Sequence, residues 1–384
     1  MNSAAEFTLV KQKGAALLIF FLILILMATS YLIPVINSSS IKNERDAKTR
    51  LALAEAKAAL IGRAVTDATI PGSLPCPSAS SVDGTSELFA GNACPSYIGW
   101  FPWHTLKVAD LRDGAYEQLL YALSPNYRDD DSAQPLNSDT PGLLSVDGRN
   151  DIVAVIFAPG TQISQSRPSN NIQDYLEGEN ANGDNLYSGI NALTANDQLI
   201  TITRDEIMQA VQKRIAREVV NALNAYFATN LYFPIPADFT DASCWGNAAI
   251  PAGCNSLPPT MEGRIPANPS IAWNPTSILS GSAGAGFWFQ NNGWREMIYY
   301  AVSALCADGT ANCANGDLTL LNQAATLVNQ KVVIVVSGRR LGAARATATL
   351  ADYLEDENAT IGNKFFSTIN TMPMPFNDFA ISIP

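Results

Sequence analysis

The pattern of hydrophobic and polar positions divides the first 66 residues into two halves of one predicted helix. Residues 15–36 form an apolar run of 22 residues without a charge, and the first charge after it is Lys42. From Ser39 to Val65, charged residues alternate with apolar ones at helical spacing. The apolar positions are Leu51, Ala54, Ala58, Ile61 and Val65. Together the halves predict one helix of about 50 residues, roughly 75 Å long, that begins at Ala15.

The apolar run has the length of a membrane-spanning helix. At 1.5 Å per residue, 22 residues cover a hydrocarbon layer of about 30 Å. The apolar part of a secretory signal peptide is shorter than this. Lys11 and Lys13 precede the run, so the positive-inside rule predicts that residues 1–14 are cytoplasmic and that the rest is exported.

Beyond this helix the sequence indicates a tandem duplication. Four pairs of segments match in the same order at spacings of 178 to 181 residues. The pairs are Gly114–Ser124 with Gly293–Ser303, Ile152–Phe157 with Val332–Val336, Asp174–Asn180 with Asp352–Asn358, and Leu199–Ile202 with Ala380–Ile383. Two copies make a tandem pair rather than a solenoid.

Each copy begins with a helix that runs into a Pro-bounded loop. Residues 204–229 carry a helical apolar stripe and lead into Phe233-Pro-Ile-Pro, as the first helix leads into Leu74-Pro-Cys-Pro. The stripe consists of Ile207, Met208, Val211, Ile215, Val219, Ala222, Leu223 and Tyr226. Strands are predicted at 116–124, 152–157 and 199–203, and again at 295–303, 332–337 and 379–383. The predicted fold class is α+β.

The junction Lys13-Gly14-Ala15, a short basic leader that ends in Gly before a long apolar helix, resembles the type IV pilins and type II secretion pseudopilins. The resemblance implies cleavage between Gly14 and Ala15 by a prepilin peptidase and N-methylation of Ala15. It further implies a transmembrane and stalk helix followed by two tandem pilin-like units, each a helix packed on an antiparallel sheet. The expected domains are a leader (1–14), the membrane-spanning and stalk helix (15–65), a first head unit (66–203) and a second head unit (204–384).

One position departs from the family pattern. The family usually has Glu at the fifth residue after the cleavage site, and this chain has Ile19 there. That Glu is thought to pair with the free amine of a neighbouring subunit. Its absence, together with the doubled head, points to a minor subunit at the tip of a filament rather than to a repeating one.

The cysteines fall into three close pairs. Cys76 and Cys94 are 18 residues apart, and the other two separations are 10 and 7 residues. The other pairs are Cys244 with Cys254 and Cys306 with Cys313. An even number in an exported chain, without metal-ligand spacing, predicts three local disulfides. Buried free thiols are the alternative.

Charge and residue chemistry narrow the function further. The chain has 24 Lys and Arg against 35 Asp and Glu, a net charge of −11, which argues against binding DNA or RNA. Its one histidine, His104, lies in an aromatic cluster, and no catalytic constellation is found, so no enzyme activity is expected. Two acidic loops offer oxygen ligands for Ca²⁺, although solvated acidic loops are the favoured interpretation, and no other cofactor is expected. Their carboxylates are Asp129, Asp130, Asp131, Asp147 and Asp151.

The expected function is that of a non-enzymatic minor pilin or pseudopilin at the tip of a type IV-like filament. Its expected location is the bacterial inner membrane, with a single span, a cytoplasmic N-terminus and a periplasmic head, and afterwards the filament outside the cytoplasm. The expected partners are other pilin subunits through the apolar helix, the prepilin peptidase and a membrane assembly platform. The alternative is a membrane-anchored enzyme, receptor or adhesin of unrelated fold.

Overall fold

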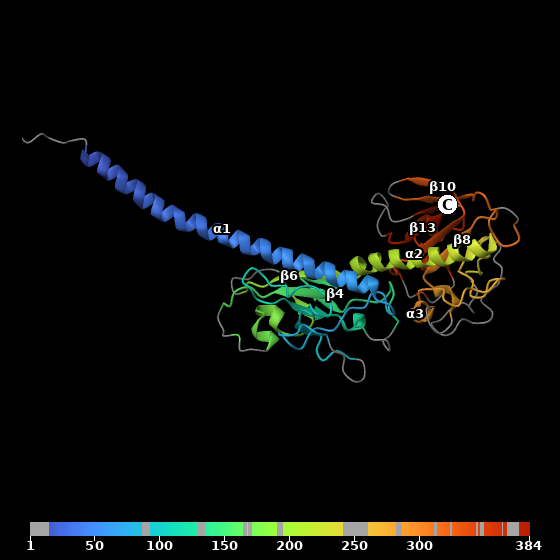
Figure 1. The fold of residues 1–384 in the computed structure, drawn as a ribbon, viewed down its shortest axis with the longest axis horizontal. Helices are drawn as coiled ribbons and strands as arrows, with labels where there is room; N and C mark the ends of the chain where they lie inside the picture. Colours follow the sequence, from blue (N-terminus) through green and yellow to red (C-terminus); the bar gives the residue numbers. More distant parts are fainter. Residues whose placement is uncertain are drawn as a thin grey trace, which may run out of the picture.

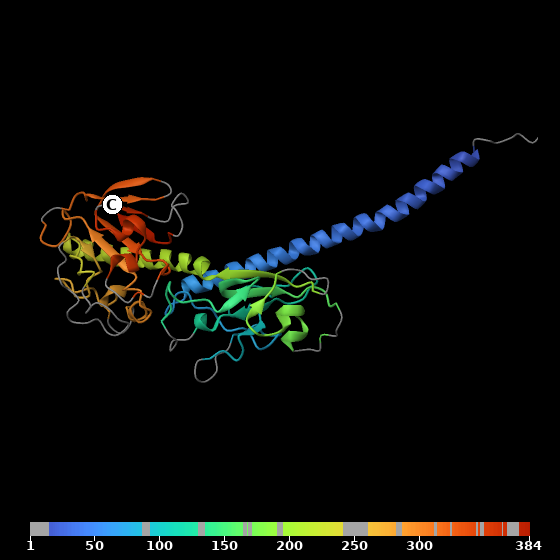
Figure 2. The ribbon, with the colours of Figure 1, turned by 180° about the vertical axis from the view of Figure 1, so that it is seen from behind.

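The computed structural model shows two lobes joined by a helix, with a second helix that projects from the first lobe (Figure 1). The structure describes residues 15–86, 93–129, 135–163, 167, 171–189, 195–240, 260–281, 286–310, 313–322, 325–342, 345, 349–362, 364–366 and 376–384. The helix α1 (Ala15–Thr66) projects, and α2 (Arg204–Asn230) runs from the first lobe into the second (Figure 2).

The C-terminal half of α1 packs on the first lobe through a stripe of mostly small side chains. Ala52, Leu53, Ala56, Leu60 and Ala64 are buried at helical spacing. Of the apolar positions identified from the sequence, Ile61 and Val65 are partly buried against the core, whereas Leu51 is 71% exposed, so the buried stripe lies one position away. The alanines let the helix axis approach the sheet and α2 more closely than the larger side chains of the predicted stripe would allow.

The first lobe is built on a six-stranded sheet. Its strands are β1 (Ile98–Trp100), β2 (Leu120–Leu123), β3 (Leu144–Val146), β4 (Arg149–Ala158), β5 (Leu186–Tyr187) and β6 (Gln198–Thr203). The order is β1-β2-β4-β3-β5, and β6 also pairs with β4. Short 3-10 helices connect the strands: η1 (Pro125–Tyr127), η2 (Ile172–Asp174) and η3 (Gly178–Ala181).

The second lobe divides its strands between two sheets. One has the order β13-β11-β8-β7 and the other has the order β10-β9-β12. The strands are β7 (Glu262–Gly263), β8 (Ile298–Val302), β9 (Leu318–Leu321), β10 (Thr326–Gln330), β11 (Val332–Val336), β12 (Lys364–Phe366) and β13 (Phe379–Ile383). The helices are η5 (Ile278–Ser280), α3 (Phe287–Asn291), η6 (Leu350–Asp352) and η7 (Asp356–Ala359).

The two lobes repeat one strand order. The antiparallel series β1-β2-β4-β6 in the first lobe has the same sequence order and direction as β7-β8-β11-β13 in the second. The parallel pair β3–β5 corresponds to β9–β12. After each long helix the chain makes an equivalent parallel bridge, Leu74 to Arg128 and Phe233 to Ala307.

The second long helix begins where β6 ends. Thr203 caps α2, because its hydroxyl accepts a hydrogen bond from the Glu206 amide while the Glu206 carboxylate accepts one from the Thr203 amide. Leu231 ends the helix in the left-handed region, with a φ of 67°. All members of the predicted stripe except Ala222 are buried, and one apolar core extends from α1 through α2 to β11.

The predicted fold class is wrong in two respects. First, the part of the chain that the structure describes has no helix with the length and apolar character needed to cross a membrane. Second, two of the three sheets are mixed, because β5 and β12 each pair in parallel, while the sheet β13-β11-β8-β7 is antiparallel. The predicted pair of pilin-like units is corrected accordingly.

The predicted location is also wrong, because it depended on the predicted membrane span. A single-pass protein of the bacterial inner membrane, with a transmembrane helix and a periplasmic head, conflicts with the absence of a membrane-spanning helix among the described residues. The prediction depended on an apolar run read from sequence alone.

Candidate functional site

The N-terminal half of α1 exposes a continuous run of apolar side chains. Every side chain from Leu17 to Met27 is exposed, from 46% at Ile23 to 72% at Leu18. These residues face all sides of the helix, so a partner on one side would leave apolar surface in water. Burying a side chain of this size contributes about 1.5–3 kcal/mol. This segment, the exposed helix segment, therefore favours enclosure by several apolar surfaces.

A buried carboxylate shapes the loop that meets α1 further along. Asp113 is 1% exposed. One of its oxygens, Oδ1, accepts hydrogen bonds from the amides of Ala115 (2.7 Å) and Glu117 (2.9 Å). The other, Oδ2, accepts one from the Gly160 amide at 2.8 Å. The carboxylate thus joins two loops of the first lobe into one wall.

The same loop lies directly against the α1 backbone. The Gly114 amide donates a hydrogen bond to the Thr49 hydroxyl at 2.9 Å. A Cβ atom at Gly114 would lie 2.2 Å from the carbonyl oxygen of Arg45, so only glycine fits. The next turn holds Tyr116 at a φ of 68°, which leaves its ring 71% exposed. The Lys48 ammonium lies 3.5 Å from the centre of that ring.

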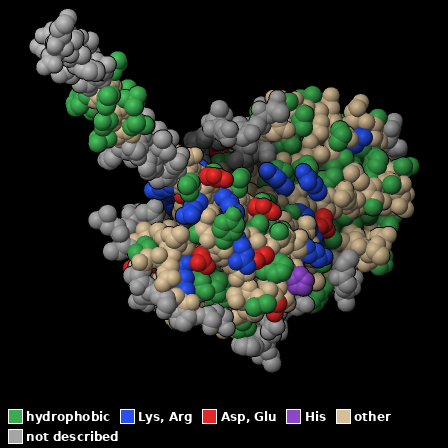
Figure 3. Space-filling model, turned by 60° about the vertical axis from the view of Figure 1, so that its left-hand side comes forward, with side chains coloured by type: hydrophobic (Ala, Val, Ile, Leu, Met, Phe, Trp, Pro, Cys, Tyr) green, Lys and Arg blue, Asp and Glu red, His purple; other side chains and the backbone are tan. Residues whose placement is uncertain are grey.

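Between α1 and these loops lies a cleft of about 690 Å³, here called the α1 cleft. The α1 wall carries two exposed cations, Lys42 and Arg45, together with Ile41, Asp46 and Thr49. The opposite wall consists of Gly114, Ala115, Gly160, Thr161, Ala195, Asn196 and Gln198. Figure 3 shows Lys and Arg side chains interspersed with Asp and Glu on the face where the helix meets the lobes. The cleft suits a segment that carries carboxylates and hydrogen-bonding groups.

The second lobe has an equivalent cleft, here called the α2 cleft, with a volume of only about 150 Å³. Its lining includes Gly338, Arg339 and Asn377, which occupy the places of Gly160, Thr161 and Asn196 in the repeat. Ser138 of the first lobe also lines it. The first lobe therefore contributes directly to this cleft.

A buried carboxyl pair joins the end of each repeat to its 3-10 helix. In the first lobe, Asp197 accepts hydrogen bonds from the Glu177 amide (2.9 Å) and from the Asn180 side chain (3.3 Å). Glu177 in turn accepts one from the Asn196 amide at 3.0 Å. Burial, with a further contribution from the Glu177 charge, raises the pKa of Asp197 to about 7.

The second lobe repeats the pair. Asp378 accepts hydrogen bonds from the Glu355 amide (3.0 Å) and the Asn358 side chain (3.1 Å), and Glu355 accepts one from the Asn377 amide (3.1 Å). Burial raises the pKa of Asp378 well above its usual value and raises that of Glu355 as well. Because the motif is the same in both lobes and holds backbone amides, its role is to fasten the chain before the last strand.

The predicted leader site is only partly within the structure. Gly14 lies outside the described residues. Ala15 is the first residue of α1, and Ile19 is 59% exposed on the exposed helix segment. Cleavage between Gly14 and Ala15 stays a prediction.

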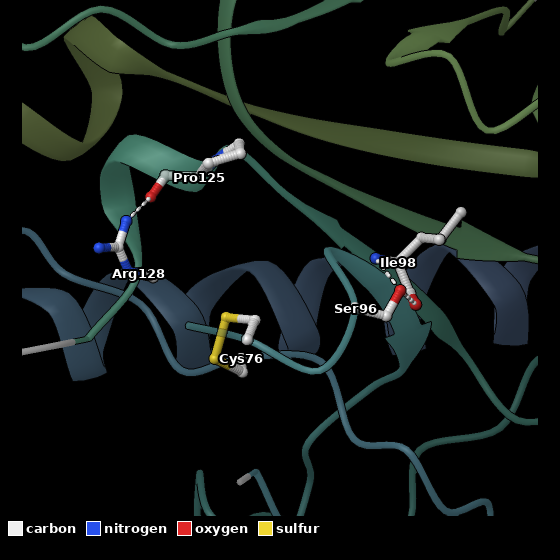
Figure 4. Close-up of a disulfide and its surroundings, with 6 residues drawn as sticks. Cys76, Ser96, Ile98, Pro125 and Arg128 are labelled. Carbon is white, nitrogen blue, oxygen red and sulfur yellow. Dashed lines mark hydrogen bonds between the residues drawn. A yellow bond between two sulfur atoms is a disulfide. The ribbon is translucent and has the colours of Figure 1, made fainter. Parts of the chain in front are cut away.

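Two of the three predicted disulfides are present. Cys76 is bonded to Cys94, and Cys306 to Cys313. The first lies beside α1, close to Ser96 and Pro125 (Figure 4). Cys244 and Cys254 lie outside the described residues. The two bridges are not duplicates of each other, because Cys76 occupies the place that Ile235 has in the second repeat.

The three candidate calcium ligands that the structure describes each have other partners. Asp129 pairs with Arg63 at 2.6 Å, and Asp151 pairs with Arg204 at 2.9 Å. Asp147 accepts hydrogen bonds from the Ser188 hydroxyl and the Gly189 amide. Within the described ranges, no three acidic, His or Cys side chains form a group that could hold a metal ion. Asp130 and Asp131 lie outside those ranges.

Sequence reasoning missed Asp113, Thr49 and the carboxyl pairs. For the carboxyl pairs a signal existed: Asn196-Asp197 recurs as Asn377-Asp378 at a spacing of 181, within the same duplication. The contact between Thr49 and Gly114 spans 65 residues and has no local signature.

Comparisons with protein families, with curated proteins and with solved structures found no match to this chain.

Proposed function

We propose that this protein is a non-enzymatic subunit of a helical, filament-like assembly, which it joins by packing the exposed helix segment among the helices of neighbouring subunits. The observation that carries the proposal is the run of eleven consecutive exposed apolar side chains from Leu17 to Met27. A surface of this kind marks a site of association. Neighbouring helices can enclose it on all sides, as in a helix bundle.

The resemblance of the N-terminal residues to type IV pilins supports a filament over a closed oligomer. On this proposal a prepilin peptidase removes residues 1–14, and Ala15 becomes the methylated N-terminus. Ile19 offers no carboxylate to the amine of a neighbour, which favours a place at the filament tip in few copies. A terminal subunit needs helix contacts with fewer neighbours than an internal one.

Replacing Leu22 with Asp tests the assembly step. Leu22 is 61% exposed in the middle of the segment, so the substitution leaves the lobes intact but places a charge among apolar helices. A charge buried there without a partner costs several kcal/mol. We expect the full-length variant to be lost from the assembled fraction in sedimentation and co-purification, by about a hundredfold or more.

Val82→Asp is the matched control, because Val82 is 84% exposed on a loop far along the chain from the segment. It should assemble as the unaltered protein does. Normal assembly of the Leu22→Asp variant would contradict the proposal. Intact-mass measurement with and without a prepilin peptidase tests the processing step separately, since an N-terminus that stays intact with the peptidase present contradicts cleavage after Gly14.

A further inference from the structure

A loop of the first lobe lies against the second lobe at the α2 cleft, and its residue Ser138 lines that cleft. Ser138 donates a hydrogen bond from its hydroxyl to the Ser337 carbonyl at 3.0 Å. The next residue, Asp139, accepts one from the Arg340 amide at 2.7 Å and lies 2.9 Å from the Arg345 guanidinium. The loop that contacts the second lobe here thus carries an aspartate, which is held by a cation and by a backbone amide.

Asn292 holds the residues that precede this loop. It occupies the position in the second repeat that Asp113 has in the first. The Asn292 side-chain oxygen accepts a hydrogen bond from the Leu136 amide at 3.0 Å, and its carbonyl accepts one from the Asn137 side chain at 2.9 Å. The Asn292 amide group donates to the Thr69 carbonyl at 3.3 Å. The turn of the second repeat is therefore used to bind the neighbouring repeat.

The α1 cleft is the same place in the first repeat, and among the described residues its lining comes only from α1 and the first lobe. It is also more than four times larger than the α2 cleft. Lys42 and Arg45 are exposed on one wall, and the exposed Tyr116 ring stands beside the other. Tyrosine and arginine are frequent anchors in interfaces.

The distribution of charge along the chain also favours a contact between α1 of one copy and the lobes of another. Residues 15–66 contain six basic and three acidic residues, although the whole chain has a net charge of −11. The lobes of one copy therefore carry the negative charge that the basic wall of another copy attracts.

We propose that the α1 cleft binds residues 313–318 of a second copy of this chain. The inference rests on the proposed function, in that it assumes that the chain assembles. This loop follows the bridge between Phe233 and Ala307. In the same way, the first-lobe loop with Ser138 and Asp139 follows the bridge between Leu74 and Arg128. It presents an exposed aspartate, Asp317, and is preceded by Leu305, which is 54% exposed.

The resulting contact is head-to-tail. Within one copy, a loop of the first lobe already contacts the second lobe. In the proposed contact, the corresponding loop of the second lobe contacts the first lobe of the next copy. A contact of this heterologous kind does not close into a dimer, so it would line up the few copies at the tip head-to-tail.

Photo-crosslinking of the full-length assembled protein tests the contact. A photoreactive amino acid replaces Tyr116, and the matched control carries it at Val82. Mixing isotopically light and heavy protein separates links between copies from links within one copy. We expect the Tyr116 position to link to a peptide within residues 304–321 of another copy, and the Val82 position not to do so. Links only to another protein, to a different segment or to none would overturn the proposal.

A charge exchange provides the second test. The double substitution Lys42→Glu and Arg45→Glu should reduce the yield of this link about tenfold, because it sets like charges against Asp317. Asp317→Lys on the second copy should restore it. Arg50→Glu, an exposed α1 residue outside the cleft lining, should leave the yield unchanged. An unchanged yield in the double variant would overturn the proposal.

The outcomes of the two proposals stay distinguishable. If the protein assembles through its helix and the Tyr116 link is absent, the cleft inference fails and the proposed function stands. If Leu22→Asp assembles normally and the Tyr116 link persists, the proposed function fails and the lobes alone drive the contact.

Discussion

The two repeats share a strand order but use the turn before their second strand in opposite ways. In the first repeat, Asp113 turns both carboxylate oxygens toward amides of its own lobe. In the second, Asn292 accepts from Leu136 and donates to Thr69, both in the other repeat. A carboxylate only accepts hydrogen bonds, whereas a carboxamide both accepts and donates. Asp113 therefore holds amides within its own lobe, and Asn292 connects the two repeats. Duplication thus kept the framework and changed the connection.

We expect the largest loss of stability from removing the Asp113 carboxylate, which holds the turn of the first repeat. Asp113→Ala leaves the partly buried amides of Ala115, Glu117 and Gly160 without their acceptor, and an unpaired amide that is fully buried costs about 1–3 kcal/mol. We expect the free energy of unfolding to fall by about 3–5 kcal/mol in urea titrations. Asn292→Ala should cost less, because fewer amides lose an acceptor. An equal or larger loss for Asn292→Ala would contradict this reading of the comparison.

The disulfides sharpen the comparison, since they occupy different places in the two repeats. Cys76–Cys94 closes a separation of 18 residues and Cys306–Cys313 one of 7. The loop-entropy relation gives about 3 kcal/mol for the longer and about 2 kcal/mol for the shorter. Double Cys→Ser variants should lower thermal stability in that order. The reverse order would show that the second lobe depends on its bridge for more than chain entropy.

The carboxyl pairs predict a pH dependence that both repeats share. The pKa of Asp197 is about 7 in the folded chain against an ordinary value of 3.8, so between these pH values the folded state holds a proton that the unfolded chain has lost. The free energy of unfolding therefore falls as pH rises through this window, while Arg167 beside Glu177 and Glu117 moderates the effect.

Asp197→Asn should flatten this dependence by about 1–3 kcal/mol between pH 4.5 and 7.5, measured by urea unfolding. Asp378→Asn, at the equivalent place, should act in the same direction, because burial raises the pKa of Asp378 too. If only one of the two substitutions changed the pH profile, the pairs would not be equivalent.

Several features followed from the sequence. The apolar stripe of α2 was predicted almost residue by residue, because a helix of 27 residues that is buried on one face repeats its pattern over seven turns. Cys76–Cys94 and Cys306–Cys313 followed from spacing. The core strands β4 and β11 followed from runs of β-branched residues such as Ile152-Val153 and Val332-Val333.

The tertiary structure alone decided the rest. Leu51 looked like a core residue, and only the close approach of α1 to the sheet selected the neighbouring stripe with Ala56 and Leu60. The short strands β5 and β12 have no periodicity of their own, because their pairing in parallel depends on a partner distant in sequence. The α1 cleft depends on Asp113 and Thr49, whose contacts join loops and a helix far apart in the chain. Sequence periodicity reports which face of an element is apolar, and only packing decides which surfaces meet.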